Sequence, residues 1–131
     1  MVLTDPISEM ITIIRNGLAS GKKEVSIWDS KMKQEILEIL KKEKFIENVK
    51  KDKNQGKDCL LVTLRYINSY PAINIIKRIS KPGRRVYIDK MHIPNIKRGK
   101  GRVIISTSKG ILTDTQAKEK GVGGELLLEV W

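Results

Sequence analysis

The sequence predicts a mixed α/β (α+β) protein of two small lobes. Its 131 residues can form one compact domain or two small ones. Hydrophobic residues make up 40% of the chain, which is enough for a core, but only 5% of residues are aromatic, so Ile, Leu and Val must supply most of it. Helical and strand patterns alternate over residues 1–66, whereas strands dominate residues 67–131. We therefore expect an N-terminal α-β-α-β-β lobe and a mostly β C-terminal lobe with a short helix.

The first element is predicted to be an amphipathic helix. Asp5 can cap its N-terminus, and Pro6 suits the first helical position because its missing N–H group has no helical partner there. Gly17 or Gly21 is expected to end the helix. The apolar stripe, with a spacing of three or four residues, consists of Ile7, Met10, Ile11, Ile14 and Leu18.

A strand, a second helix and a hairpin complete the first lobe. Residues 23–28 alternate as in a short strand, and Ser30 can cap the helix that follows. Residues 45–50 and 59–66 flank a polar segment, which predicts a hairpin with a loop longer than two residues. In the second helix we expect an apolar face of Met32, Ile36, Leu37 and Leu40, with Lys31, Lys33, Lys41 and Lys42 largely outside it.

The second lobe is predicted to consist mainly of strands. Residues 72–80 and the segment RRVYID are extended on either side of a turn at Pro82–Gly83. HIPNIKRGKGR then forms a basic connector with room for one helical turn. RVIISTS is a further strand, TDTQAKEKG is a short helix capped by Thr113 or Asp114, and ELLLEVW is the closing strand.

Residue types that commonly carry catalysis or bind metals are scarce. His92 has no second histidine with which to bind a metal, and Cys59, in the apolar run CLLV, is expected to be a buried hydrophobic residue. Neither a P-loop nor a GxGxxG motif occurs. His92, Ser106 and Asp114 supply the residue types of a Ser–His–Asp triad, but no nucleophile-elbow motif accompanies them. We predict no enzyme activity, no cofactor and no metal.

The sequence gives no sign of export or of membrane insertion. Charged residues and a proline near the N-terminus, among them Asp5 and Arg15, interrupt any apolar signal region. The longest uncharged run, residues 66–76, is too short to span a bilayer. We therefore expect a cytosolic protein.

Positive charge is concentrated in residues 77–102, which we call the basic segment. The formal net charge of the chain is +11, and this segment alone holds ten Lys or Arg residues against the single acid Asp89. Such a concentration repels itself unless a polyanion neutralises it, which predicts contact with nucleic acid. Lysines of the second helix are more simply explained as a solvated face, although Lys31 at its start can add to a binding surface.

Cations contact phosphates and specify little sequence, so other residues must supply specificity. In STSKG the hydroxyls of Ser106, Thr107 and Ser108 follow a predicted strand. They either contact ribose and base edges or simply form a turn that satisfies the backbone, and the residues alone favour neither interpretation. Tyr87, within the basic segment, can stack on a base or ribose.

The motif GVGGE precedes the closing strand. Gly121 suits a helix C-cap, and Gly123 and Gly124 permit positive φ angles or the close approach of another backbone. Glu125 can accept hydrogen bonds from donors such as those of Ser106–Ser108 and can orient them or read an amino edge. The alternative is an ordinary strand-edge glutamate.

The chain resembles the bacterial family of small-ribosomal-subunit protein eight. The likeness rests on ISTSKGILTD followed by GVGGELLLEVW, with TDPISEMITIIRNG near the start and KPGRRVYI between them, and it covers essentially the whole chain. It implies a two-domain α/β protein that binds an irregular helix in the central domain of small-subunit ribosomal RNA early in assembly, with contacts to small-subunit protein five. Family members also repress translation of their own operon through a messenger RNA site that mimics the ribosomal one.

The resemblance also assigns candidate RNA-binding residues and leaves one alternative open. The basic segment would largely anchor the RNA. A free regulatory RNA- or DNA-binding protein that acts outside the ribosome is the alternative, and sedimentation with small subunits in high-salt washes would separate the two. Expected to contact RNA are Ser106, Thr107 and Ser108, with Gly123, Gly124 and Glu125 beside them, Lys109, Arg84 and Tyr87 in support, and Lys31 reaching neighbouring RNA.

Overall fold

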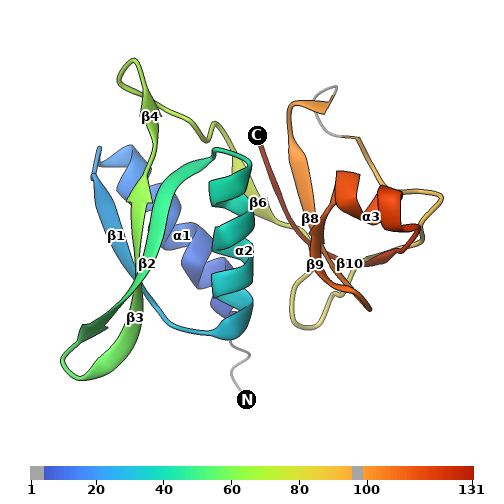
Figure 1. Ribbon diagram of the computed structural model, residues 1–131, viewed down its shortest axis with the longest axis horizontal. Helices are drawn as coiled ribbons and strands as arrows, with labels where there is room; N and C mark the ends of the chain where they lie inside the picture. The colour runs from blue at the N-terminus through green and yellow to red at the C-terminus, as the bar shows by residue number, and fades with distance from the viewer. Residues whose placement is uncertain (1–4, 96–98) are drawn as a thin grey trace. The chain divides into compact units, whose positions relative to one another are not determined.

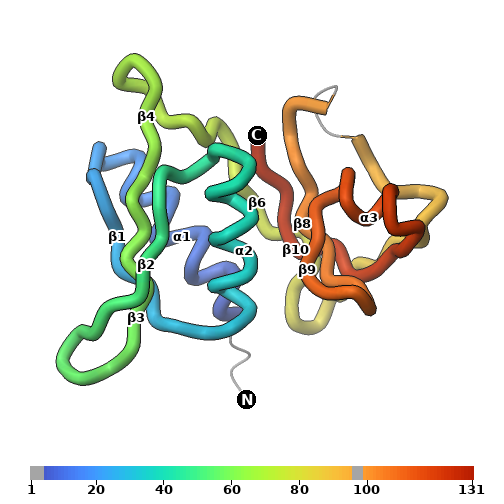
Figure 2. The backbone as a smooth tube through the Cα atoms, in the orientation of Figure 1, coloured from blue at the N-terminus to red at the C-terminus, as the bar shows by residue number. Residues whose placement is uncertain are grey.

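The computed structural model describes residues 5–95 and 99–131, which form two compact units (Figure 1). One unit comprises Glu9–Asn74, and the other comprises Ile75–Trp131 together with the described residues up to Ser8. The backbone trace in Figure 2 follows the chain through each unit. Within residues 5–95 and 99–131, none of the helices combines the length and hydropathy that a bilayer span requires.

Helix α1 (Pro6–Ala19) begins directly after Asp5, as predicted. Gly17 lies inside the helix rather than at its end. A Cβ atom at Gly17 would lie only 2.6 Å from Cγ1 of Val25, so this position allows the helix to pack closely against the next strand. The helix ends two residues before Gly21. Of the predicted stripe, Ile7, Met10, Ile11 and Ile14 are buried.

The first unit contains a three-stranded antiparallel sheet in the order β1-β3-β2. Its strands are β1 (Glu24–Trp28), β2 (Ile46–Asn54) and β3 (Lys57–Leu64). Helix α2 (Lys31–Lys42) follows β1 and is capped as predicted, because the Ser30 side chain accepts the N–H of Lys33 at 3.2 Å.

The predicted apolar face of α2 is wrong at two positions. Lys33 is only 7% exposed, whereas Met32 is 42% exposed. Lys33 lies three residues before Ile36 and seven before Leu40, so it shares their buried helical stripe. The aliphatic stem of a lysine can occupy such a position.

The loop between β2 and β3 is shorter than predicted. Asn54 pairs with Lys57, so only Gln55 and Gly56 form the loop. Both residues have positive φ angles, 53° and 78°, as a two-residue type I′ turn requires. The sequence concealed this turn because glutamine stands where asparagine or aspartate usually precedes the glycine.

A small hairpin extends the first unit beyond residue 66. It consists of β4 (Tyr66–Ile67) and β5 (Tyr70–Pro71), and the N–H of Ala72 donates to the carbonyl oxygen of Arg65 at 2.9 Å. Residues 66–72 therefore fold back next to Arg65, which directly follows β3. The chain passes from the first unit to the second between Asn74 and Ile75.

The second unit is built on a sheet in the order β6-β10-β8-β9, with β7 also paired to β10. The extended segments predicted over 72–80 and in RRVYID contain only the short strands β6 and β7. Lys81 and Arg84 exchange backbone hydrogen bonds around the predicted Pro82–Gly83 turn. The predicted helical turn of the connector falls in part on residues 96–98, outside the described residues. The strands are β6 (Ile76–Arg78), β7 (Tyr87–Ile88), β8 (Arg102–Thr107), β9 (Gly110–Thr113) and β10 (Gly124–Val130).

Helix α3 (Asp114–Lys120) packs on one face of this sheet (Figure 1). Thr113 is its N-cap and forms a capping box with Gln116, while Gly121 ends the helix in the left-handed conformation, as predicted. Asp114, the alternative cap, is the first residue of the helix, and both it and Thr113 are buried. The core between helix and sheet is formed by Ile93, Val103, Ile105, Leu112, Ala117 and Leu126.

Candidate nucleic-acid interface

Strand β10 brings together three residues that are far apart in the sequence. Glu125 pairs with Tyr87 of β7 on one side and with Ser106 of β8 on the other. Residues directly opposite one another in antiparallel strands carry their side chains on the same face of the sheet. Tyr87, Glu125 and Ser106 therefore form a row across three strands, which we call the β10 row. Tyr87 is the most open member, at 69% exposed.

The three adjacent hydroxyls of STSKG do not act together. Ser106 belongs to the β10 row, whereas Thr107, one residue further along β8, faces the other side of the sheet. The Thr107 hydroxyl donates to the carbonyl oxygen of Gly110 at 2.8 Å and accepts the N–H of Lys109 at 3.0 Å. The Thr107 hydroxyl thus stabilises the turn between β8 and β9. The hydroxyls of Ser106 and of the exposed Ser108 have no hydrogen-bond partner among the described residues.

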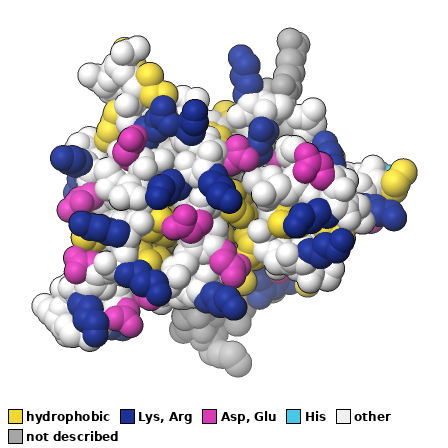
Figure 3. Space-filling model, viewed as in Figure 1, with side chains coloured by type: hydrophobic (Ala, Val, Ile, Leu, Met, Phe, Trp, Pro, Cys, Tyr) yellow, Lys and Arg dark blue, Asp and Glu magenta, His cyan; other side chains and the backbone are white. Residues whose placement is uncertain are grey.

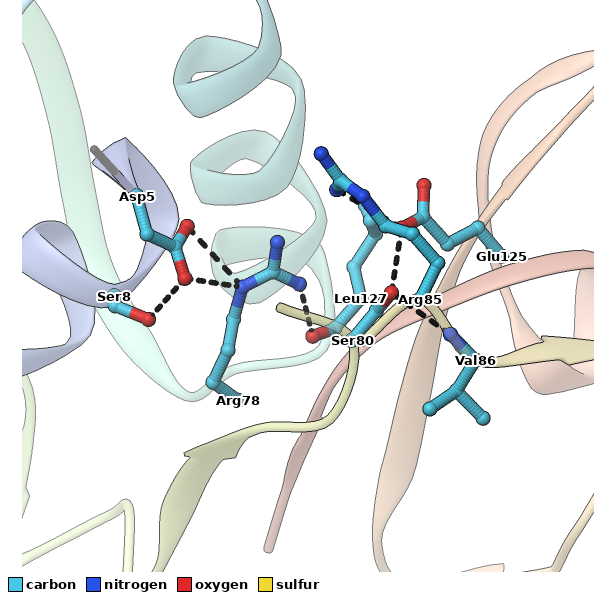
Figure 4. A network of polar contacts seen from close by, with 8 residues as sticks. All are labelled: Asp5, Ser8, Arg78, Ser80, Arg85, Val86, Glu125 and Leu127. Atoms are coloured by element: carbon cyan, nitrogen blue, oxygen red, sulfur yellow. Dashed lines mark hydrogen bonds and ion pairs between the residues drawn. The ribbon is translucent and has the colours of Figure 1, made fainter. Parts of the chain in front are cut away.

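Glu125 does not accept hydrogen bonds from the side chains of Ser106–Ser108, which corrects our expectation. Its Oε2 atom accepts instead from the Ser80 hydroxyl at 2.5 Å and from Nη1 of Arg85 at 3.1 Å (Figure 4). Ser80 is completely buried, and its hydroxyl also accepts the N–H of Val86 at 3.0 Å. The carboxylate is therefore fixed by residues from both sides of the Pro82–Gly83 turn.

The other carboxylate oxygen of Glu125, Oε1, is partly accessible to solvent. No described residue binds it. Every buried polar side-chain atom in the described chain has a partner, so an unpartnered oxygen of this half-buried residue must be accessible. The same reasoning applies to the Ser106 hydroxyl. The β10 row thus presents an aromatic ring, a hydrogen-bond acceptor, and a group that can both donate and accept.

Gly123 and Gly124 set the spacing of β10 from its neighbours. A Cβ atom at Gly124 would lie 2.0 Å from the carbonyl oxygen of Ser106, and one at Gly123 would lie 2.2 Å from that of Ile88. Both contacts are impossible for real side chains. The sequence alone allows either positive φ angles or the close approach of another backbone at these glycines. Close approach of another backbone is what both glycines permit.

Part of the basic segment is committed to contacts inside the second unit. The Arg78 side chain, only 6% exposed, donates from Nε to Asp5 at 3.2 Å and from Nη1 to the carbonyl oxygen of Leu127 at 2.6 Å (Figure 4). Lys77 forms an ion pair with Glu129 at 3.1 Å. Arg78 is thus a buried structural side chain and Lys77 is paired at the surface, so fewer cations of the segment are available for anchoring than its composition predicts.

Several cations nevertheless have no ion-pair partner within the described chain. Lys97 and Arg98 lie outside the described residues. Lys109 is exposed in the β8–β9 turn, next to Ser108. The unpaired cations of the basic segment, all exposed, are Lys81, Arg84, Lys90 and Lys100.

Lys31 is the one predicted RNA contact that does not belong to the second unit. It is exposed at the first position of α2 and belongs to the Glu9–Asn74 unit. In Figure 3, basic and acidic side chains are interspersed over α2, β2 and β3. This mixture is typical of a solvated surface, which is the simpler interpretation of the lysines on α2.

The start of α1 is tied to β6 through Asp5. Burial by itself raises the pKa of the Asp5 carboxyl, but hydrogen bonds from Ser8 and Arg78 outweigh that effect, so the pKa lies below its ordinary value. The Ser8 hydroxyl and its backbone N–H both contribute. Asp5 therefore caps the N-terminus of α1, as predicted, and also pairs with the nearly buried Arg78.

The residues of the hypothetical Ser–His–Asp triad share no hydrogen bond. Asp114 is buried and accepts the N–H of Val103 at 3.3 Å. His92 is exposed, and its Nδ1 lies 2.7 Å from Asp89, a hydrogen bond that lowers the pKa of Asp89. Cys59 is a buried free cysteine, as predicted. Among residues 5–95 and 99–131, no group of three His, Cys, Asp or Glu side chains is placed to hold a metal ion.

Sequence reasoning missed Ser80 and the internal roles of Arg78 and Arg85. Ser80 lies 45 residues from Glu125, and no local pattern links the two. The only available signal was that Ser80 directly precedes the predicted turn and therefore lies where two extended segments meet. The arginines were counted as charge because composition says nothing about their partners.

The chain is similar to proteins of known name along its whole length. The model of the family described as Ribosomal protein S8 matches residues 5–131. A protein from Nitrosomonas europaea named Small ribosomal subunit protein uS8 is 47% identical over 130 residues, covering 99% of each chain. A protein of the same name from Geotalea uraniireducens is 48% identical over 132 residues, covering 100% of each chain.

Proposed function

Because the chain belongs to the ribosomal protein S8 family, we propose that it binds the central domain of small-subunit ribosomal RNA and supports assembly of that subunit. Its family is one of ribosomal structural proteins and not of enzymes. Its location is accordingly the ribosome, in the cytoplasm. The RNA site, its partners and its regulation are the parts that we propose.

The observation that carries the RNA proposal is the β10 row, with unpaired cations on the same unit. A regular RNA duplex hides its base edges in a deep, narrow groove, so a protein reads sequence only where the helix is irregular. The short hydroxyl of Ser106 and the fixed Glu125 suit that task, while Tyr87 can stack on an exposed base. Lys81, Arg84 and the other unpaired cations would contact phosphates and supply affinity.

Two further parts of the proposal rest on the family resemblance. Small-subunit protein five is the proposed protein neighbour in the ribosome. The messenger RNA of the protein's own operon is the proposed second RNA ligand, through a site that mimics the ribosomal one.

The test is binding to a central-domain ribosomal RNA fragment and to an unrelated regular duplex, each across a salt series. Wild type is compared with a Ser106→Ala, Ser108→Ala double variant, since both hydroxyls are unpartnered. We expect wild type to prefer the ribosomal fragment and the double variant to lose about tenfold of that preference with an unchanged salt slope.

A Thr107→Ala variant is the control, because its hydroxyl forms the turn and its loss should lower stability more than preference. Equal binding of both RNAs by wild type would contradict the proposal. Unchanged preference in the double variant would move the specificity to other residues.

A further inference from the structure

The Glu125 carboxylate is held by residues that lie outside the β10 row. Ser80 and Arg85 both donate to the same oxygen, Oε2 (Figure 4). The Ser80 hydroxyl is itself fixed because it accepts the N–H of Val86, and the backbone N–H of Ser80 donates to the carbonyl oxygen of Leu126 at 3.0 Å. Two hydrogen bonds to one oxygen fix the direction in which the other oxygen points.

That other oxygen, Oε1, can only accept a hydrogen bond, because an ionised carboxylate has no proton to donate. A phosphate is also an acceptor and carries the same sign of charge, so it cannot be the partner. The complementary RNA group is a hydrogen-bond donor, either a base amino group or a ribose 2′-hydroxyl. Arg85 also offsets the carboxylate charge, which reduces its repulsion from nearby phosphates.

We infer that Ser80 and Arg85 are positioning residues that orient Glu125 to accept a hydrogen bond from such an RNA donor. The inference rests on the proposed RNA binding and deepens it, since it assigns selectivity to two residues that act through a third. A merely structural role for them would change stability without changing discrimination between RNAs.

The experiment compares variants on the central-domain ribosomal RNA fragment and on a regular duplex of equal length. Ser80→Ala and Arg85→Gln are each expected to lower the preference for the fragment about tenfold, the scale of one hydrogen bond to a charged group. Glu125→Gln should lose the same preference, because Ser80 and Arg85 attract its carbonyl oxygen and leave its amide donor facing the RNA. Combining Ser80→Ala with Glu125→Gln should cost no more preference than Glu125→Gln alone.

Arg84→Gln is the matched control for Arg85→Gln. It removes the same charge from the neighbouring residue, which is exposed and has no ion-pair partner in the described chain. We expect it to weaken binding to both RNAs equally and to reduce the salt slope by about 0.7 to 0.9. Ser80→Ala leaves the N–H of Val86 without its acceptor, so Arg85→Gln at its more exposed position decides the question if Ser80→Ala fails to fold.

Three outcomes separate the ideas. Loss of preference in the variants, with melting temperatures above the assay temperature, supports the positioning role. Full preference in Ser80→Ala and Arg85→Gln overturns that role while the proposed function stands. A wild-type protein without preference overturns both.

A further arm identifies the donor. The fragment is prepared with 2′-deoxy nucleotides at its unpaired positions, which removes the ribose hydroxyls that Glu125 can reach. If Glu125→Gln then binds this RNA as well as wild type does, the donor is a 2′-hydroxyl. If the tenfold difference persists, the donor is a base amino group.

Discussion

Single residues of this protein take their roles from the partners that they meet. Ser106 and Thr107 are adjacent and chemically alike, yet one hydroxyl is open in the β10 row and the other forms a turn. Alternation along the strand separates them by pointing their side chains to opposite faces. Likewise Arg84 is free among the described residues, whereas Arg85 is committed to Glu125. Residue type alone therefore does not identify a binding residue in this surface.

Asp5 gives a prediction at the residue scale. Its pKa in the folded protein lies below the ordinary value of 3.8, so its ionised form stabilises the fold above that pH. The contribution is lost as pH falls below 3.8 through the folded pKa. We expect Asp5→Asn to lower the free energy of unfolding by about 1 to 2 kcal/mol at pH 7 and by less at pH 2.5, as measured by urea unfolding.

Glu119→Gln is the control for this measurement, because Glu119 is exposed on α3 and has no ion pair within the described chain. Its effect should stay within about 0.5 kcal/mol at both pH values. An Asp5→Asn effect that is equally large at pH 7 and pH 2.5 would show that the ion pair with Arg78 is not its source.

Helices and strands follow local rules wherever the deciding partner lies within a few residues. Ser30 caps α2, and Thr113 with Gln116 caps α3, because each cap bonds a backbone N–H three residues away. The β2–β3 hairpin is the exception, since its turn contains a glutamine in the left-handed region. Here the pairing of two long strands imposes a conformation that the turn residue itself disfavours.

That strain gives a prediction at the scale of an element. Gln55→Asn should raise the free energy of unfolding by about 0.5 to 1 kcal/mol, because asparagine adopts positive φ angles more readily than glutamine does. Urea unfolding measures the change. Gln55→Ala, which lacks this advantage, should give no gain. If both variants were equally stabilised, relief of backbone strain would not be the cause.

At the scale of the whole molecule, the net charge of +11 is distributed between two uses. Arg78, Lys77 and Arg85 neutralise acids within the second unit. Lys81, Arg84, Lys90 and Lys100 keep their charge for solvent or for a polyanion. Together with Lys109 in the β8–β9 turn, the second group can release counterions when RNA binds and so contributes to the salt dependence of binding.

A comparison of two double variants tests this division. Lys81→Gln with Arg84→Gln should reduce the slope of log affinity against log salt by about 1.5, as expected for two lost phosphate contacts. Lys41→Gln with Lys42→Gln removes the same charge from the last turn of α2 and should leave the slope unchanged. Equal slopes for both double variants would indicate that net charge, rather than the basic segment, governs binding.

The sequence by itself determined the helices, most strands and the caps of this protein. Periodic burial in α1, the Ser30 and Thr113 caps and the Pro82–Gly83 turn depend on neighbours a few residues away, so a local pattern is sufficient to predict them. The family likewise follows from motifs that are contiguous in the chain. One local feature, the apolar stripe of α2, was predicted wrongly at Lys33. A charged lysine is expected at the surface, although its aliphatic stem can be buried.

Only the tertiary structure decided which of the candidate residues share a surface. The β10 row exists because the register of β7, β10 and β8 aligns Tyr87, Glu125 and Ser106, and a shift of one residue would turn a member to the other face. Ser80 reaches Glu125 across 45 residues for the same reason. Strand pairing is fixed by cooperative packing of the whole sheet, and that information lies in no short stretch of the sequence.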